Sequence, residues 1–325
     1  MRPFFECSHS SMQALKCPRR AQEITLRGLQ DPGSPQALSG TAVHMIAAEN
    51  AIACSKKGRT VLHWETFQRV VERGMRKFYD EHREDWPDLD KDASLASEIW
   101  QKAWDLHRNV RLPRSVKGAP WRHIPEQRIV AQWAPGEDGH LRVLTSSEVY
   151  KLHNRFGRIV HSRLAFDVLS GKPDLLSLTG ETEDERTTWT KAYVLDIKSG
   201  RAVVQYRDMK YVEQLRWYAF LTFLAYPTVQ SVEVVVSGFH LAGNTGSYTY
   251  KRETDCGGLT LMEWGTRKAE DYFRLLGLLF TALPHDEDWP AQEGHCDYCP
   301  VSMALKCPKQ LAGLESFGLL EVLRG

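Results

Sequence analysis

Asp174, Asp196 and Lys198 are the residues whose types and spacing most clearly indicate chemistry; they lie in the segments Gly-Lys-Pro-Asp and Val-Leu-Asp-Ile-Lys-Ser-Gly. Asp196 and Lys198 are two positions apart, so on a strand they project from the same face of the sheet. Asp174 begins the neighbouring strand and is expected beside Asp196. Two adjacent carboxylates repel each other unless a cation offsets their charge, and oxygen ligands suit Mg²⁺ or Mn²⁺. Lys198 would then orient or deprotonate a water, or stabilise charge on a phosphate.

The elements that position these three residues are predicted to be strands. Residues 123–178 are rich in Val, Ile and alternating residues, which predicts an antiparallel meander. A polar, charged hairpin at 179–191 leads into 192–198, a nearly continuous apolar strand suited to a central place in a sheet. Further strands are predicted near 229–241 and 246–253.

Helices are predicted on both sides of this strand-rich region, from apolar residues that recur with helical periodicity. They cover part of 9–30 and the segments 41–55, 64–84, 93–110, 208–225 and 260–281. The order of elements predicts an α/β (α+β) protein with a mixed central sheet flanked by helices. We expect a helical N-terminal region at 1–120, a core at 121–285 and a C-terminal cysteine cluster and tail at 286–325.

Composition excludes several classes of protein. The chain has 325 residues, of which 42% are hydrophobic and 26% are charged, so it is neither collagen-like nor wholly disordered. A formal net charge of +1 means that any binding of nucleic acid must come from a local patch. The longest apolar runs, 217–226 and 275–283, are too short to span a bilayer, and no secretory signal is visible. We therefore expect a soluble, cytoplasmic (intracellular) protein without a membrane partner.

The cysteines indicate a metal site rather than disulfides, because seven are too few for a disulfide scaffold and the number is odd. Cys296, Cys299 and Cys307 are clustered, and Cys17 would supply a fourth ligand. Four thiolates suit either tetrahedral zinc or a [4Fe–4S] cluster, and spacing alone does not separate the two. Cys7 competes with Cys17 as the N-terminal ligand.

Three motifs in order resemble the PD-(D/E)xK nuclease superfamily: Gly-x-x-Asp, then Asp-x-Lys-x-Gly on a separate strand, then Gln-Leu-Arg-Trp-Tyr on the next helix. The likeness is to the RecB-like nuclease domain, including CRISPR adaptation nucleases, phage-type exonucleases and helicase–nuclease subunits with an iron–sulfur cluster. It covers the whole chain apart from a helical insert at 55–120. It implies a restriction-endonuclease-like fold of a mixed sheet flanked by helices.

The resemblance also implies roles for individual residues of the metal site. Asp174, Asp196 and the main-chain carbonyl of Ile197 would bind the metal, and Lys198 would be the catalytic lysine. His44, which follows Gly-Thr-Ala-Val, matches the metal-binding histidine that the family carries on an N-terminal helix. These matches imply a site for Mg²⁺ or Mn²⁺.

Other matches lie around that site. Gln214 and Tyr218 match the Gln-x-x-x-Tyr motif, whose members share one helical face beside the active site and contact DNA. Glu126 matches an acidic catalytic residue that some members carry on the first strand of the sheet. For the cysteines, Cys17-Pro fits the N-terminal signature of the family better than Cys7 does. One N-terminal and three C-terminal cysteines around the nuclease core imply, by this resemblance, an iron–sulfur cluster, with zinc as the alternative.

The segment after Lys198 interleaves basic and aromatic residues, a pattern that can follow phosphates and stack bases. We expect Arg201, Arg207 and Lys210 to contact DNA. Together these features predict a metal-dependent DNA nuclease, most simply an exonuclease, of a bacterial or phage-like context. It would act in DNA processing or recombination, beside a recombination, helicase or integrase partner. The alternative is a nuclease-fold module that binds DNA or a partner protein without cutting.

Overall fold

The computed structural model forms two compact units, each built from segments that are separated in the chain. The first unit takes Met1–Pro32, Ile129–Gly171 and Cys256–Gly325, and the second takes Gly33–Arg128 and Lys172–Asp255. The structure describes residues 4–27, 35–84, 86–113, 119–126, 128–133, 142–152, 163–183, 186–198, 211–238, 247–283 and 289. The mixed α/β class and the helix-flanked sheet that the sequence predicts are confirmed.

The second unit contains a five-stranded sheet among its described residues, in the order β2-β6-β7-β8-β9. The strands are β2 (Trp121–Pro125), β6 (Leu175–Glu183), β7 (Arg186–Lys198), β8 (Ser231–Gly238) and β9 (Ser247–Tyr250). β7 pairs in antiparallel fashion with β6 and in parallel fashion with β8, and the other neighbours are antiparallel. The apolar strand that carries Asp196 is therefore central, as its sequence predicts.

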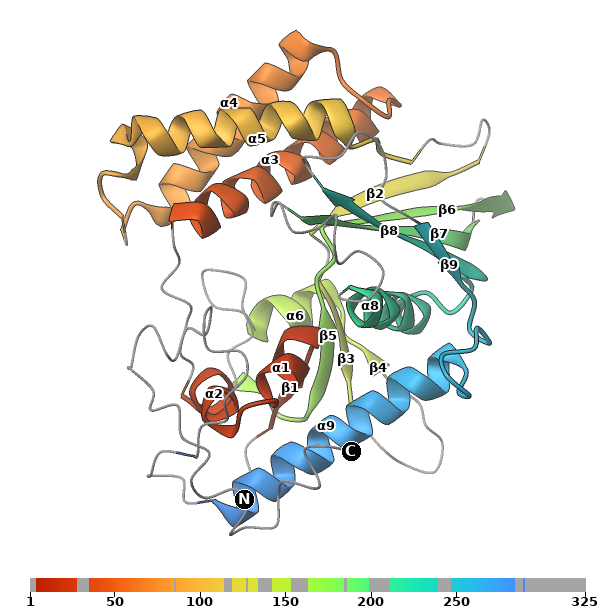
Figure 1. Cartoon of the computed structure of the whole chain (residues 1–325). Coiled ribbons are helices and arrows are strands. Elements are labelled where there is room, and N and C mark those ends of the chain that lie inside the picture. Colours follow the sequence, from red (N-terminus) through yellow and green to blue (C-terminus); the bar gives the residue numbers. More distant parts are fainter. Residues whose placement is uncertain are drawn as a thin grey trace. The chain divides into compact units, whose positions relative to one another are not determined.

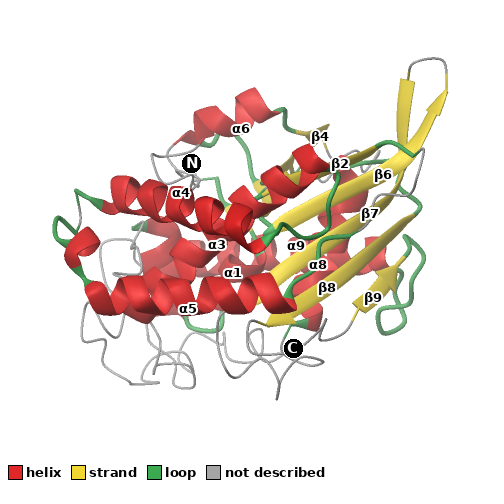
Figure 2. Cartoon of the chain, turned by 90° about the horizontal axis from the view of Figure 1, so that it is seen from above, coloured by secondary structure: helices red, strands yellow, loops and turns green. Residues whose placement is uncertain are grey.

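Helices cover both faces of this sheet (Figures 1 and 2). α3 (Pro35–Lys57), α4 (Trp64–His82) and α5 (Ala93–Asn109) bury one face, where Leu195, Ile197 and Val235 join their core. α8 (Val212–Ala225) lies on the opposite face against β7 and β8. Since successive residues of a strand face opposite ways, Asp196 and Lys198 are turned toward the side of α8. None of the helices in the described segments is long and apolar enough to span a membrane.

α3 is fixed by close packing and by a polar contact. A Cβ atom on Gly74 of α4 would lie 2.6 Å from Ile46 Cγ1 on α3, so only glycine lets the two helices approach this closely. At the start of α3, Ser39 Oγ donates to Glu98 on α5, and Lys102 Nζ donates to the same Ser39 Oγ. Glu98 and Lys102 are also paired at 2.8 Å. These contacts fix α3 against α4 and α5.

The first unit contains a second mixed sheet, in the order β1-β5-β3-β4. Its strands are β1 (Glu6–Cys7), β3 (Ile129–Gln132), β4 (Arg142–Val143) and β5 (Val168–Gly171). β1 is parallel to β5, and the other pairs are antiparallel. The described helices of this unit are α1 (His9–Ala14), α2 (Pro18–Ala21), a π-helical turn at Gln22–Leu26, α6 (Ser146–Leu152) and α9 (Leu261–Ala282).

Two expectations about the strands were wrong. The region 123–178 is not one meander, because β2 and β6 belong to one sheet and β3, β4 and β5 to the other. The residues Ser146–Leu152 form helix α6 instead of continuing a strand. The physical reason for the helix is a capping box: the amide of Thr145 donates to Glu148 Oε2 at 2.8 Å, and the Thr145 hydroxyl accepts from the amide of Glu148.

Candidate active site

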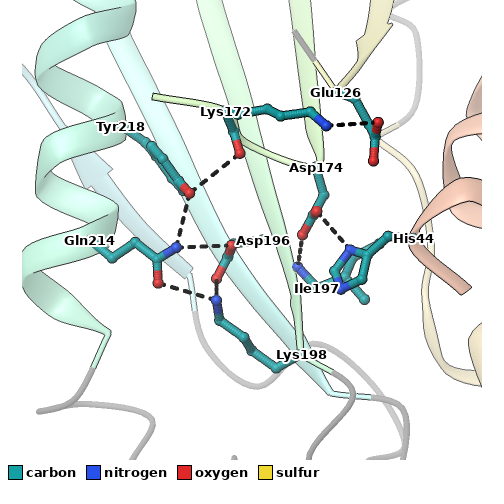
Figure 3. A network of polar contacts seen from close by, with 9 residues as sticks. All are labelled: His44, Glu126, Lys172, Asp174, Asp196, Ile197, Lys198, Gln214 and Tyr218. Carbon is teal, nitrogen blue, oxygen red and sulfur yellow. Dashed lines mark hydrogen bonds and ion pairs between the residues drawn. The ribbon is translucent and has the colours of Figure 1, made fainter. Parts of the chain in front are cut away.

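Three acidic residues lie next to one another in register on three neighbouring strands of the second unit, each one position beyond the last residues that pair among these strands. Pro125 pairs with Leu175, and Leu175 pairs with Leu195. The next register position therefore brings together Glu126, Asp174 and Asp196. The amide of Glu126 donates to the main-chain carbonyl of Asp174 at 2.9 Å, which ties the end of β2 to the start of β6. Figure 3 shows the resulting polar network at this edge of the sheet.

Asp174 contacts helix α3 on one side and strand β7 on the other. Its Oδ1 lies 2.7 Å from His44 Nδ1, and its Oδ2 accepts from the amide of Ile197. Burial alone would raise the pKa of Asp174, but the His44 charge, its hydrogen bond and the Ile197 amide outweigh burial and lower that pKa. Burial would lower the pKa of His44, but Asp174 raises it above its usual value. Asp174 and His44 thus each shift the pKa of the other toward its charged form.

Asp196 pairs with Lys198 on the same face of β7. Lys198 Nζ lies 2.7 Å from Asp196 Oδ2, and the two side chains are 21% and 5% exposed. Burial raises the pKa of Asp196, and the charge of Asp174 adds to this effect while Lys198 opposes it. The pKa of Lys198 is raised because its pairing with Asp196 outweighs burial. The charge of Asp174 therefore acts on Asp196, and a cation held between the two carboxylates would relieve their repulsion.

Helix α8 adds an amide and a phenol to this arrangement. Gln214 Oε1 accepts from Lys198 Nζ at 3.1 Å, and its Nε2 donates to Asp196 Oδ1 at 3.4 Å and to Tyr218 Oη at 2.9 Å. The Tyr218 hydroxyl donates in turn to the carbonyl of Lys172 at 3.3 Å. Tyr218 is 8% exposed. The four-residue spacing of Gln214 and Tyr218 places both on one helical face, as expected.

The donors at this edge have the chemistry of a site for a hard divalent ion. They are two carboxylates, an imidazole and the main chain at Ile197, which suit Mg²⁺ or Mn²⁺. In the described residues no three His, Cys, Asp or Glu side chains are arranged to hold an ion as they stand. As the structure stands, Asp174 is paired with His44 and Asp196 is paired with Lys198.

The structure brings most of the predicted site residues into one network. His44, Asp174, Asp196, Ile197, Lys198, Gln214 and Tyr218 are linked by the contacts above. Glu126 stands at its border, where its Oε2 lies 3.0 Å from Lys172 Nζ. Arg201, Arg207 and Lys210, expected to contact DNA, lie outside the described residues.

The predicted cysteine site is described only at one of its members. Cys17 immediately precedes helix α2 and is partly exposed. Cys296, Cys299 and Cys307 lie outside the described residues. Cys7 is fully buried, and burial, followed by the charges of Glu6 and Asp167, raises the pKa of its thiol.

Two residues that contact the site were not among the site residues predicted from the sequence. Lys172 contacts Glu126 through its side chain and Tyr218 through its carbonyl. Tyr211 places its ring 4.9 Å from Lys198 Nζ, a cation–π distance. Lys172 lies inside Gly-Lys-Pro-Asp, but its contact with Tyr218, like that of Tyr211 with Lys198, depends on how α8 packs against the strands.

Comparison with known families agrees with this geometry. A family model described as the PD-(D/E)XK nuclease superfamily matches residues 6–304. A search of curated proteins finds no match for the chain. The match to the family model spans well over half of the chain and includes the residues of the polar network shown in Figure 3. The protein belongs to the PD-(D/E)XK nuclease superfamily.

Proposed function

We propose that this chain is a Mg²⁺- or Mn²⁺-dependent deoxyribonuclease, an exonuclease of DNA processing or recombination. The observation that carries the proposal is the meeting of Asp174, Asp196 and Lys198 at one strand edge, with His44 beside them. Acids that can hold a divalent ion, with an amine in direct contact, suit the hydrolysis of phosphodiesters, in which negative charge develops on the phosphate oxygens and on the leaving oxygen.

Asp174, Asp196, His44 and the carbonyl of Ile197 would hold the ion. When bound, the ion would supply charge neutralisation at the phosphate and lower the pKa of an attacking water. To act as a ligand, His44 would have to release its contact with Asp174 Oδ1. The donor set supports this assignment.

Lys198 would assist the attacking water or stabilise the charge that develops on the phosphate. Its ammonium is held by Asp196 on one side and by the Gln214 carbonyl oxygen on the other. Because two acceptors fix its position, the amine needs little reorganisation when the reaction begins. Gln214 and Tyr218 keep their expected role beside DNA, and their contacts support an additional positioning role.

Cleavage assays on end-labelled single- and double-stranded DNA with Mn²⁺ test the proposal. We expect the wild-type protein to release nucleotides from ends, to spare closed circles and to stop in EDTA. Asp174→Ala, Asp196→Ala and Lys198→Ala should each abolish cleavage while the fold survives. Glu233→Gln is a matched control, because Glu233 is an exposed acid on β8 of the same sheet. Full activity of purified Asp196→Ala would remove the assignment, and rapid cutting of circles would make the enzyme an endonuclease.

We also propose that Cys17, Cys296, Cys299 and Cys307 hold a [4Fe–4S] cluster. Support comes from the Cys-x-x-Cys spacing, and from the contrast between the partly exposed Cys17 and the buried Cys7 with its raised thiol pKa. Four thiolates would fix distant parts of the chain to one another. A brown preparation that contains iron and sulfide, with absorption lost on oxidation, is the expected result. Zinc without iron would overturn the cluster.

A further inference from the structure

Lys172 is a cation beside the candidate active site that the proposed function does not use. It is held at two points: its carbonyl accepts from Tyr218 at 3.3 Å, and its Nζ lies 3.0 Å from Glu126 Oε2 (Figure 3). The side chains of Lys172 and Glu126 are 42% and 33% exposed. Since Asp174 follows two residues later, this ammonium lies at the accessible border of the acidic site.

Glu126 has a backbone conformation that its side chain does not favour. Its φ is 50°, the left-handed region, and among the described non-glycine residues it is the one with a positive φ. An ordinary residue there costs about 1 kcal/mol relative to glycine. Glycine would keep the main-chain hydrogen bond to Asp174. The backbone therefore does not explain why Glu stands at position 126 rather than Gly. The carboxylate does, through its contact with Lys172.

The two lysines of the site differ in how firmly they are engaged. Lys198 is 21% exposed and has both Asp196 and Gln214 as acceptors, so its ammonium is fixed within the network. The pair of Lys172 and Glu126 is more exposed, and exposed ion pairs contribute only about 0–1 kcal/mol. Exchanging Glu126 for another anion would therefore cost Lys172 little.

We propose that Lys172 binds a backbone phosphate of the DNA strand in the active site, and that Glu126 holds and shields its charge until that phosphate displaces the carboxylate. The inference rests on the proposed function, because DNA is the polyanion that would pass this edge. It gives the acidic site an accessible cation, two residues before Asp174, that can pair with a backbone phosphate of the bound strand. Glu126 is on this view a positioning residue for Lys172.

The test is the equilibrium binding of labelled single-stranded and duplex oligonucleotides to the full-length protein in EDTA, where affinity is measured without cleavage. Lys172→Met should weaken binding about 10-fold, as expected for a lost charged hydrogen bond. It should also reduce the slope of log affinity against log salt by about 1. Lys191→Met is the matched control, because Lys191 is an exposed lysine on β7 of the same sheet, and its binding should equal that of the wild type.

Glu126→Gly separates the carboxylate from the backbone, since glycine adopts the same left-handed conformation without strain. Binding should tighten by up to about 5-fold, the value of an exposed ion pair. Wild-type affinity and salt slope in Lys172→Met would overturn the phosphate contact. Weaker binding in Glu126→Gly, or loss of cleavage at unchanged affinity, would overturn the shielding role.

These outcomes are distinct from a failure of the proposed function. Wild-type protein that binds DNA but never cleaves it, with weaker binding in Lys172→Met, would leave the phosphate contact standing and remove the nuclease activity. Cleavage by the wild type together with unchanged binding in Lys172→Met would support the nuclease activity and remove the phosphate contact.

Discussion

Gln214 connects the parts of the site at the scale of single residues. Its amide contacts Asp196, Lys198 and Tyr218 at once, at distances between 2.9 and 3.4 Å. An amide is suited to this place because its oxygen accepts from the ammonium while its NH₂ group donates to both the carboxylate and the phenol. No carboxylate or amine of the same shape could serve all three partners.

Replacing Gln214 by Ala should lower kcat by about 10- to 100-fold, the usual effect of removing a group that orients an active-site residue. The reason is that Lys198 loses one of two acceptors while Asp196 keeps its charge. Steady-state cleavage should show the loss in kcat, with KM changed less. Gln214→Glu should rescue poorly, because a second carboxylate would compete with Asp196 for Lys198. Equal kcat in all three proteins would contradict the positioning role.

The residues of the site were readable from sequence to different degrees. Asp196 and Lys198 could be placed on one face because strand alternation is rigid, and Asp174 followed from the hairpin that joins β6 to β7. The role of Lys172 could not be read, because it depends on the left-handed backbone of Glu126 and on a hydroxyl that arrives from α8. Such contacts exist only once three elements have met.

At the scale of elements, the packing of α3 on α4 determines where His44 stands. Gly74→Ala would bring a Cβ within 2.6 Å of Ile46 Cγ1, and Ile46 is two residues after His44. We expect a loss of stability of about 1–3 kcal/mol from overpacking. We also expect reduced cleavage, because α3 must shift. Thermal unfolding and a cleavage assay measure the two effects.

The matched control for this change is Gly277→Ala in α9. A Cβ atom there meets no heavy atom within 4 Å, so alanine should leave the protein unchanged or stabilise it by up to about 1 kcal/mol. Equal melting temperatures for the two variants would mean that α3 and α4 do not require the small residue.

The buried His123 on β2 makes stability depend on pH. Burial lowers its pKa from 6.5 to about 4; its Nδ1 contacts Ser177 Oγ, and the Trp121 ring packs against it. Between pH 6.5 and about pH 4, His123 is therefore protonated in the unfolded chain but neutral in the folded chain. The free energy of unfolding should fall by up to about 3 kcal/mol as the pH drops from 6.5 to about 4, and should then become independent of the state of His123. Denaturant unfolding of His123→Gln should lack this component; the same pH slope in both proteins would exclude His123.

Helices and strands were predicted correctly where a periodic pattern of apolar residues extended over many positions. The prediction was wrong where a few capping hydrogen bonds determine the secondary structure. The helices over 64–82 and 93–109 and the long strand β7 were found within a few residues. α6 lies in the region whose Val, Ile and alternating residues predict strands. The Thr-x-x-Glu pattern at its start was the available signal, and its capping hydrogen bonds decide the outcome.

At the scale of the whole molecule, the first unit depends on segments that the sequence does not visibly join. β1 has two residues, too few for any strand signal, yet Phe5 is fully buried and its amide donates to Asp167, 162 residues away. The Tyr272 hydroxyl on α9 donates to the carbonyl of Glu6 at 3.0 Å. The division into two sheets was unpredictable for this reason.

Deleting residues 1–8 should therefore destabilise the first unit in particular. β5 loses its parallel partner, and Tyr272 loses an acceptor inside the protein. Hydrogen exchange should show lost protection in β5 and in the part of α9 near Tyr272, while α4 in the second unit keeps its protection. Full protection of β5 in the deleted protein would show that β1 is dispensable.

The interleaving of the two units has a consequence for the order in which they can form during synthesis. The residues of the polar network, from His44 to Tyr218, all belong to the second unit, whose last segment ends at Asp255. The sheet of the first unit already has its strands by then, but α9 begins only at Leu261. A ribosome-bound chain can thus complete the proposed site while the other unit still lacks α9, the longest of its described helices, so the nascent protein acquires the residues proposed for chemistry before that helix is made.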